Sequence, residues 1–466
     1  MAKRWLGILT VLTLLLAACG ESGTTTTAAG GTGDTSASGE VTDIEMWIAF
    51  ADDTRLGFAE DKAAAFNAAH PEFNVVVQSF DSYNTVFEQA QLALDGGNPP
   101  EIIHFFEAAT QEAIDAVDAA GAPIFKSVTA AIDGRTEILG EPVILDDVVS
   151  AARNYYTIDG DFYSMPWNTS SAIMFVNQDL LDAAGVDIPK TWADVDAACD
   201  TILAMDDAPS GCITWPNHSW FIEQTLGQEG ELLANNDNGR AARATEVNVA
   251  SDGMKAYFQW WKDLDTSGKY LYTGVQRDWD GTNAAFQAKE VAMLIYSSSD
   301  TTVLTETGAE NGFNVVAAPM PYNGDVPFEG NLIGGATLWL LNGLDKTTED
   351  GALAFMNFFS NPENAAEWHK ITGYIPITNA AVQLLKDEGW YETSPNSLVA
   401  SDQLDAAADT PAARGALLGN FVSIRDVLTA AAENMLVNDG DVTTILDEAQ
   451  GEAQRLLDEY NALFSN

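Results

Sequence analysis

The chain has 466 residues and a formal net charge of −48, from 69 acidic and 21 basic side chains. This charge argues against a nucleic-acid partner, because phosphate backbones are bound by clustered Lys and Arg. A chain of this length exceeds one ordinary domain, so we expect two lobes.

The N-terminal segment predicts export from the cytoplasm. Two basic residues precede an apolar stretch, Trp5–Ala18, which is shorter than the roughly 20 residues of a membrane-spanning helix and is typical of a secretory signal. It ends in Leu-Ala-Ala-Cys-Gly at 16–20, which resembles a bacterial lipobox. We therefore expect a signal peptide over 1–18, lipid on Cys19, a disordered tether over 19–40, and anchoring to the outer face of a bacterial cell membrane. The alternative is an ordinary cleaved signal with an incidental cysteine.

The next part of the chain alternates between strand and helix patterns. Turn and breaker residues separate these segments, among them Pro71 and the pairs at 96–97 and 99–100. The patterns predict strands at 44–48, 73–77 and 102–106, with helices between them at 58–69 and 83–94. This alternation indicates an α/β fold with mostly parallel strands.

Later segments repeat the same alternation. Thr191 is an expected N-cap with Asp194 three residues on, and Asn361 followed by Pro362 is a second helix start. The patterns predict strands at 171–177, 291–296 and 331–341, and helices from 179, from 191, over 361–373 and over 441–464.

Motifs for catalysis or metal binding are missing from the sequence. With 69 carboxylates, no spacing between two of them singles out a glycosidase pair. The four histidines lack ligand spacing, and we find no nucleophile elbow or phosphate loop. We therefore expect no enzymatic activity, cofactor or metal. Cys199 and Cys212 are expected to form a disulfide, because exported cysteines usually pair.

Two polar clusters and a glycine pair have the composition of a binding surface. Residues 167–171 and 296–299 place aromatic, hydroxyl and amide groups at strand ends, where open α/β sheets bind ligands. Taken alone, each cluster also fits a turn or helix cap. Gly334-Gly335 fits either a tight bend or a close approach of the backbone to a ligand.

Several segments resemble one known family. They are 361–378 (NPENAAEWHKITGYIPIT), 333–339 (IGGATLW), 419–425 (GNFVSIR), 168–171 (NTSS) and 189–192 (PKTW). The chain is similar to the large extracytoplasmic solute-binding proteins of carbohydrate-type ABC importers, and among them to receptors for sn-glycerol 3-phosphate. The likeness spans about Ile44–Phe464 and is weakest over Asp206–Arg243.

The resemblance implies two α/β lobes joined by crossing strands, with a ligand cleft between them: lobe one at 41–160 plus 298–342, and lobe two at 161–297 plus 343–466. It implies a monomer that delivers glycerol 3-phosphate, and glycerophosphodiesters as second ligands, to importer permease subunits. The site residues carried over are Tyr83, Glu107, Ser170, Trp192, Ser297, Gly335, Tyr374 and Arg425.

The chemistry of these residues suits a phosphate monoester. Arg425 offers a fork of donors, although an isolated arginine in so acidic a chain also fits a surface salt bridge. Glu107 would accept from glycerol hydroxyls, and Trp192 would pack on the carbon chain. Two rivals remain open: a receptor for a neutral sugar, which would favour aromatic platforms over a buried arginine, and a cell-surface hydrolase, which needs a catalytic pair.

Overall fold

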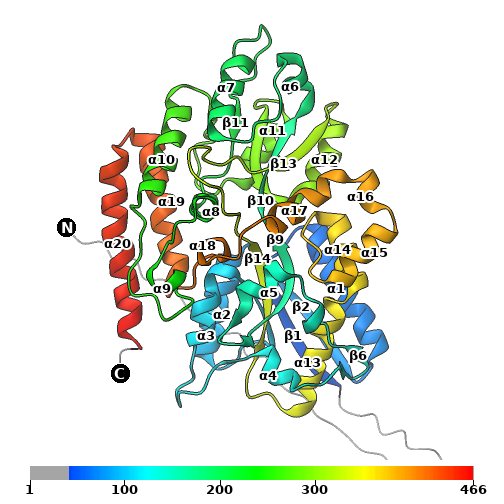
Figure 1. The fold of residues 1–466 in the computed structure, drawn as a ribbon. Helices are drawn as coiled ribbons and strands as arrows, with labels where there is room; N and C mark the ends of the chain where they lie inside the picture. Colours follow the sequence, from blue (N-terminus) through cyan, green and yellow to red (C-terminus); the bar gives the residue numbers. More distant parts are fainter. Residues whose placement is uncertain (1–40, 465–466) are drawn as a thin grey trace, which may run out of the picture. The chain divides into compact units, whose positions relative to one another are not determined.

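Two β-sheets organise the chain in this computed structural model, which describes residues 41–464 (Figure 1). The first sheet has six strands, in which β14 pairs with β3 on one side and with both β4 and β9 on the other. The strand order is β2 (Phe73–Ser79), β1 (Thr42–Ile48), β3 (Ile102–Phe106), β14 (Gly334–Leu341) and β4 (Phe125–Lys126), with β9 (Met165–Ser170) also on β14.

The second sheet has four strands, and two short hairpins stand apart from both sheets. Its order is β11 (Ile213–Thr214), β12 (Met293–Ser297), β10 (Ala172–Asn177) and β13 (Val315–Pro319). The hairpins are β5 (Glu137–Ile138) with β6 (Glu141–Pro142), and β7 (Thr157–Ile158) with β8 (Asp161–Phe162).

The expectation of parallel strands is confirmed for the three N-terminal strands and was wrong for the later ones. The pairs β1–β2, β1–β3 and β11–β12 are parallel, but β10 and β14 are antiparallel to their long neighbours. The reason is the path of the chain. β9 in the first sheet is followed after the single residue Ser171 by β10 in the second, and β13 in the second sheet precedes β14 in the first. A strand that enters from the other sheet runs against the β1–β3 layer.

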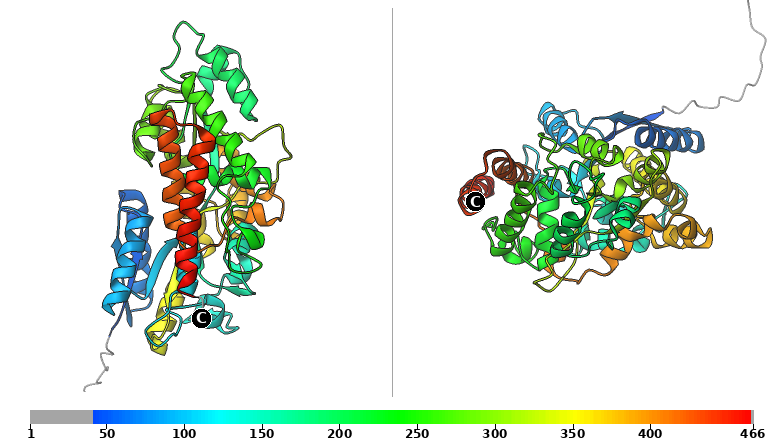
Figure 2. Two further views of the ribbon diagram at one scale, coloured as in Figure 1. Left: turned by 90° about the vertical axis from the view of Figure 1, so that its left-hand side faces the viewer. Right: turned by 90° about the horizontal axis from the view of Figure 1, so that it is seen from above.

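Helices surround both sheets. Helices α1 and α13 pack on β1 and β2, α2 packs on β3, and α19 lies beside α20 in all views (Figure 2). The helices are α1 (Asp53–Ala69), α2 (Tyr83–Gly96), α3 (Thr110–Asp115), α4 (Val128–Ile132), α5 (Ser150–Tyr156), α6 (Gln178–Ala184), α7 (Trp192–Ile202), α8 (Ser219–Glu229), α9 (Asn235–Asn238), α10 (Asp252–Thr266), α11 (Trp279–Gln287), α12 (Thr301–Glu310), α13 (Lys346–Phe359), α14 (Pro362–Thr372), α15 (Asn379–Asp387), α16 (Trp390–Thr393), α17 (Val399–Asp405), α18 (Pro411–Arg414), α19 (Phe421–Asn438) and α20 (Val442–Ala462). Four 3₁₀ turns are η1 (Glu107–Ala109), η2 (Leu145–Asp147), η3 (Ser298–Asp300) and η4 (Pro395–Leu398).

The predicted helix starts are confirmed. Thr191 and Asp194 form a reciprocal capping box at α7. Asn361 accepts from the backbone of Asn364 at the start of α14, with Pro362 as the first helical residue. These side chains satisfy backbone N–H groups that the first helical turn leaves unpaired, which is why a few residues are enough to locate a helix start.

The predicted lobe boundaries do not follow the two sheets. They place β9 in lobe two and β13 in lobe one, whereas β9 pairs within the first sheet and β13 within the second. Helix α13, also assigned to lobe two, packs on β1 of the first sheet. The two-lobe division stays a prediction, and the sheets are the natural centres of such lobes.

A disulfide joins Cys199 in α7 to Cys212 just before β11, with their Cα atoms 5.4 Å apart. Replacing both buried cysteines with alanine removes a covalent closure between positions 13 residues apart. We expect the free energy of unfolding, measured by denaturant titration, to fall by about 3 kcal/mol. Reductant should destabilise the parent and leave the double variant unchanged. Equal stability of the reduced and oxidised parent would contradict a stabilising role.

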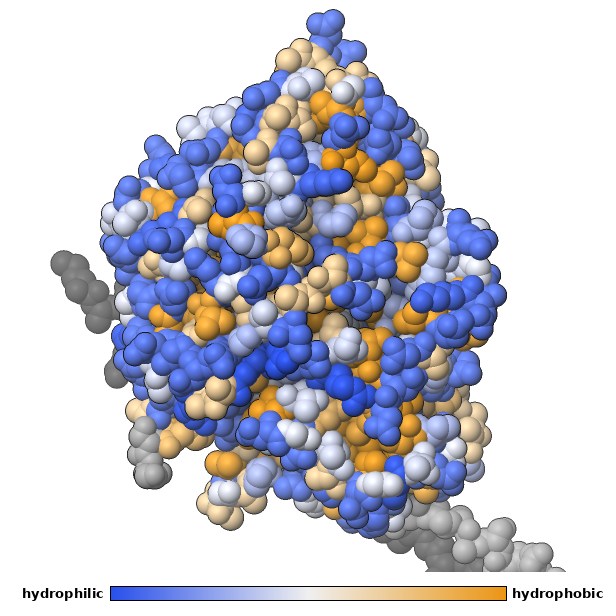
Figure 3. All heavy atoms as spheres, viewed as in Figure 1, coloured by the Kyte–Doolittle hydropathy of each residue, from blue (hydrophilic) through white to orange (hydrophobic). Residues whose placement is uncertain are grey.

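The surface visible in Figure 3 is mostly hydrophilic, with apolar side chains scattered in small groups. None of the helices within residues 41–464 combines the length and the apolar character needed to cross a bilayer. The predicted signal peptide, the predicted lipidation at Cys19 and the predicted tether all fall outside the described residues.

Candidate ligand-binding site

Arg425, in the second turn of α19, is held between two carboxylates. Its Nε and Nη2 donate to Glu223 of α8 at 2.7 and 2.6 Å, and Nη2 also donates to Glu107 at 2.8 Å. Glu107 follows β3 directly, so the contact joins the first sheet to the helices α8 and α19. All three side chains are buried. We call them the arginine triad; it carries one positive and two negative charges.

The pKa shifts of the triad follow from burial and pairing. Burial by itself lowers the pKa of Arg425, but attraction to Glu223 and Glu107 outweighs it and holds the pKa above its ordinary value. Burial raises the pKa of Glu223, and Arg425 opposes that rise. The guanidinium also lies 4.8 Å from the ring centre of Phe421. Arg425 is therefore a permanent buried cation and not a surface salt bridge.

Two tyrosines lie next to the triad. The Tyr83 ring stacks on Phe106, with centroids 5.6 Å apart, and Arg425 lies 6.0 Å from the same Phe106 ring. The Tyr83 hydroxyl is 3.4 Å from that of Tyr374, which stacks on Trp368. Burial raises the pKa of Tyr83 well above its ordinary value, so its hydroxyl is neutral. Phe106 thus joins the tyrosine pair to the arginine triad.

A buried histidine supports the Tyr83 hydroxyl from behind. The backbone N–H of Ala49 donates to His104 Nδ1 at 3.3 Å, and His104 Nε2 lies 2.7 Å from the Asn168 side-chain oxygen. The Asn168 amide nitrogen donates to the Tyr83 hydroxyl at 2.7 Å. Burial lowers the pKa of His104 to about 3, so the ring is neutral.

The serine positions lie where the chain crosses between the sheets. Ser170 ends β9 opposite Gly334, and Ser297 ends β12 opposite Ala172. The backbone N–H of Ser171, between β9 and β10, donates to the Ser298 hydroxyl oxygen at 3.2 Å. Both serine clusters therefore meet at one place.

The loop after α14 reaches the same crossing. The N–H of Ile375 donates to the carbonyl of Thr169 at 2.7 Å, which brings Tyr374 beside β9. A Cβ on Gly373 would lie 2.5 Å from the Ser298 carbonyl oxygen, so the glycine allows this approach. Contacts thus connect seven of the eight predicted site residues: Tyr83, Glu107, Ser170, Ser297, Gly335, Tyr374 and Arg425.

The glycine pair has a structural explanation. A Cβ on Gly334 would lie 2.4 Å from the Trp220 ring, and one on Gly335 would lie 2.0 Å from the Asn168 carbonyl oxygen. Gly335 also has a φ of +101°, which side chains disfavour. Gly334 makes room for Trp220, and Gly335 allows the close approach of β9 and β14.

The structure does not bring Trp192 to the other seven residues. It is the first residue of α7 and stacks on Trp260 of α10, with centroids 5.0 Å apart and an interplanar angle of 10°. It also contacts Tyr257, and the neighbouring Thr191 pairs with Tyr322. Trp192 therefore packs with the aromatic side chains of α10.

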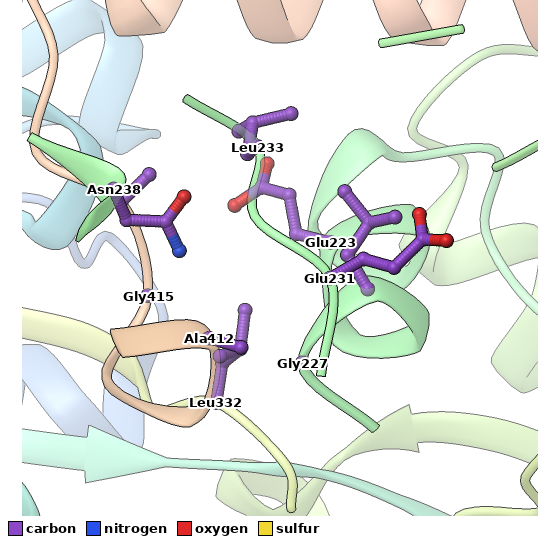
Figure 4. A pocket seen from close by; sticks show the side chains of 10 residues that line it. Glu223, Gly227, Glu231, Leu233, Asn238, Leu332, Ala412 and Gly415 are labelled. Atoms are coloured by element: carbon purple, nitrogen blue, oxygen red, sulfur yellow. The ribbon is translucent and has the colours of Figure 1, made fainter. Parts of the chain in front are cut away.

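A small cavity lies behind Glu223, between α8, α18 and the segments that follow α8 and precede α19 (Figure 4). Its volume is about 10 Å³, which is room for about one water molecule. The lining residues include Glu223, Gly227, Glu231, Asn238 and Gly415. A ligand larger than water therefore cannot occupy this side of the triad without movement of the surrounding elements.

Comparison with known proteins decides the class. A profile described as bacterial extracellular solute-binding protein matches residues 62–398, more than half of the chain. The chain belongs to the bacterial extracellular solute-binding proteins. It is accordingly a solute-binding protein of an ABC importer, and hence a transport receptor and not an enzyme. Its place of action is outside the cytoplasm.

The receptor is similar to curated sn-glycerol-3-phosphate-binding periplasmic proteins named UgpB. That of Escherichia coli O1:K1 is 27% identical over 429 residues, covering 90% of this chain and 93% of the relative. That of Pectobacterium atrosepticum is 29% identical over 429 residues, covering 89% and 91%.

Solved structures confirm a periplasmic solute-binding fold. UgpB from Mycobacterium tuberculosis, in complex with glycerophosphocholine, matches with a TM-score of 0.73 at 20% identity, covering 90% of this chain and 98% of that one. The GacH receptor of Streptomyces glaucescens, solved unliganded and with acarbose, matches with a TM-score of 0.72 at 17% identity, covering 90% of this chain and 99% of that one. A phosphodiester receptor and a sugar receptor are thus equally close in fold.

Sequence reasoning missed three residues of the candidate site. Glu223 and Trp220 lie in the region where the resemblance was weakest, although an acid that directly follows the apolar residues 220–222 was a usable signal of a buried pair. Arg55 lies 5.0 Å from the ring centre of Phe50, which packs against both Tyr83 and Tyr374. A cation in the first turn of a helix is unfavourable beside the positive end of the helix dipole. The position of Arg55 at the start of a helix was therefore a usable signal of a functional role.

A buried carboxyl beside the triad makes stability depend on pH. Burial raises the pKa of Glu112 to about 8, and its Oε2 is buried without a hydrogen-bond partner. The charged groups that influence it are Asp115 and Arg425. The folded state binds this proton more tightly than the unfolded state. Protonated Glu112 therefore stabilises the folded state at pH values below the ordinary pKa of a glutamate. That contribution is lost as pH rises from about 4.5 towards 8, by up to about 1.4 kcal/mol per pH unit.

We therefore expect Glu112→Gln to match the parent near pH 5 and to exceed it in stability near pH 8, because the amide carries no charge at either pH. Denaturant titrations at several pH values measure the difference. Glu306→Gln, an exposed change on α12, is the control and should leave the pH slope unaltered. If the free energy of unfolding changed with pH equally in the parent and in Glu112→Gln, the result would show that Glu112 ionises normally.

Proposed function

We propose that this receptor binds sn-glycerol 3-phosphate and delivers it to the permease subunits of its ABC importer. The observation that carries the proposal is Arg425, a buried guanidinium in a chain with 21 basic residues. A guanidinium presents paired N–H donors that match two phosphate oxygens. Tyr83 and Tyr374 add neutral hydroxyls beside it. The similarity to proteins named for sn-glycerol 3-phosphate, over 90% of this chain, supports the same ligand class.

Ligand entry, in this proposal, exchanges the partners of Arg425. The phosphate takes the place of Glu107 at Nη2, while Glu223 keeps its two contacts on the other side of the guanidinium. Glu107 is then free to accept from the glycerol hydroxyls. We propose two lobes, each centred on one sheet, because Glu107 follows a strand of the first sheet whereas Arg425 and Glu223 come from helices. Separation of the lobes would open the triad.

The charge of the triad bears on the preferred ester. A phosphomonoester carries nearly two negative charges near neutral pH, and Glu223 stays beside the guanidinium. A phosphodiester carries one charge and meets less repulsion from Glu223. We therefore propose glycerophosphodiesters as second ligands of the same site.

A neutral sugar is the second candidate, and two observations favour it. Arg425 already has two carboxylate partners, so an anion must displace one of them before it gains a contact. Aromatic side chains also surround the crossing point, including Trp220 and Trp279, and the GacH receptor, solved with acarbose, has the same fold. A sugar would use Glu107 and Glu223 as hydroxyl acceptors and leave the triad intact.

Calorimetric titration of the purified protein separates these ligands. We expect sn-glycerol 3-phosphate and sn-glycero-3-phosphoglycerol to bind, and maltose not to bind. Binding of maltose alone would keep the receptor role and discard the phosphate site. Absence of heat with all three would discard both ligand classes.

We also propose that Cys19 carries the lipid that anchors the receptor to the cell membrane. The run Leu-Ala-Ala-Cys-Gly at 16–20 supports this proposal. Cells fed labelled palmitate should yield labelled receptor, and Cys19→Ser should abolish the label. Label that persists in the variant would refute lipidation at this residue.

A further inference from the structure

A second arginine lies beside the tyrosine pair, Tyr83 and Tyr374. The guanidinium of Arg55, in the first turn of α1, is 5.0 Å from the ring centre of Phe50. The same ring packs on both tyrosines, with centroids 5.9 and 6.1 Å apart. Arg55 Nη2 also lies 3.8 Å from Asp300, which directly follows the second serine cluster. Arg55 is therefore placed where the tyrosines and the serines of the candidate site meet.

The terminal nitrogens of Arg55 are uncommitted. Nε donates to the exposed Asp52 at 2.7 Å, and the 3.8 Å contact with Asp300 is an ion pair that is too long for a hydrogen bond. Within residues 41–464, neither Nη1 nor Nη2 makes a hydrogen bond. The side chain keeps 27% of its exposure. An anion can therefore reach this fork without displacing a partner, whereas at Arg425 it must first displace Glu107.

The charge of the site favours a second cation. The arginine triad already has a net charge of one negative unit, and a phosphomonoester adds nearly two more near neutral pH. Burial alone lowers the pKa of Arg55, but attraction to Asp300 and Tyr374 outweighs burial and holds the pKa above its ordinary value. Arg55 is therefore always charged. Asp52 is exposed, so water and salt screen its competing charge.

We propose that Arg55 is a second phosphate contact and sets the preference of the receptor for a dianionic monoester over a monoanionic diester, an inference that rests on the proposed function. Nη1 and Nη2 would donate to phosphate oxygens that Arg425 leaves free. This cation offsets the repulsion of the second phosphate charge by Glu223. A diester carries one charge less and gains less from it. The competing explanation is an arginine that only pairs with Asp52 and Asp300.

Calorimetry with two esters tests the role of Arg55. The probes are sn-glycerol 3-phosphate and its methyl phosphodiester, which differ by one charge and one methyl group. Arg55→Gln should weaken binding of the monoester by about 30-fold and of the diester by about fivefold or less. Arg55→Lys keeps the charge and should recover part of the loss. Arg455→Gln is the matched control, because Arg455 is also held by two carboxylates, and should change neither affinity.

Asp300→Asn distinguishes a phosphate contact from a structural ion pair. Removal of the competing carboxylate leaves Arg55 charged, so monoester binding should strengthen by about threefold. A merely structural pair would be broken by either substitution. Weaker monoester binding in Asp300→Asn, together with equal losses of both esters in Arg55→Gln, would overturn the inference.

Arg425→Ala separates this inference from the proposed function. Monoester binding that is lost in Arg425→Ala but unchanged in Arg55→Gln would overturn the role of Arg55 and leave the proposed function standing. Binding that is lost in Arg55→Gln but kept in Arg425→Ala would support Arg55 and remove Arg425 as the phosphate partner. A parent protein that binds neither ester would overturn both.

Discussion

Arg425→Ala is expected to abolish binding of sn-glycerol 3-phosphate and to destabilise the receptor. The guanidinium is the proposed phosphate partner, and loss of a bidentate charged contact should weaken affinity by at least about 100-fold. The same change leaves Glu107 and Glu223 buried without a cation. Breaking a buried ion pair by removing one partner costs about 3–5 kcal/mol. Calorimetry measures the first effect, and denaturant titration the second.

A further variant separates the two effects. Arg425→Met combined with Glu107→Gln and Glu223→Gln removes all three charges, so we expect much of the stability to return while phosphate binding stays lost. Arg455→Ala, on the exposed face of α20, is the matched arginine control and should change neither property. Undiminished affinity in Arg425→Ala would refute the phosphate site.

Gly335→Ala is expected to be the most damaging single-methyl substitution among the glycines of β14. The new Cβ would lie 2.0 Å from the Asn168 carbonyl oxygen, and the residue would keep a φ of +101°. Because β9 and β14 would have to separate, we expect a loss of about 3 kcal/mol or more, which thermal unfolding would detect.

Gly343→Ala is the matched control for Gly335→Ala. Its φ is +81°, and a Cβ there would meet nothing within 4 Å. It should cost only the strain of the left-handed backbone, about 1 kcal/mol. Equal losses in the two variants would show that φ, and not the contact with β9, sets the requirement at 335. Because Asn168 also contacts Tyr83, Gly335→Ala should weaken ligand binding as well.

Local signals explain what could be predicted from the sequence. The bounds of β3 and the capping box of α7 depend on residues within a few positions of each other, and both were predicted correctly. The direction of β14 could not be derived in this way. It depends on the crossing from the second sheet, which no local pattern encodes.

The candidate site was harder to predict than the helix starts, because its residues lie far apart in the sequence. Contacts of the triad join residues 202 and 318 positions apart, so the partner Glu223 had no local signature beyond its place after three apolar residues. The resemblance supplied seven residues that the structure brings together. Trp192 was placed among them by its motif, but it stacks on Trp260, which lies 68 positions away in the sequence.

The hydrogen-bond chain behind Tyr83 fixes where its hydroxyl proton can go. The backbone amide of Ala49 occupies Nδ1 of the neutral His104, so the ring proton must sit on Nε2 and point at Asn168. The amide oxygen of Asn168 is then an acceptor, and its nitrogen donates to the oxygen of Tyr83. With its oxygen accepting from Asn168, Tyr83 can direct its own proton to the Tyr374 hydroxyl, 3.4 Å away, or to a ligand. A ligand oxygen that accepts this proton would therefore take the place of Tyr374 as its partner.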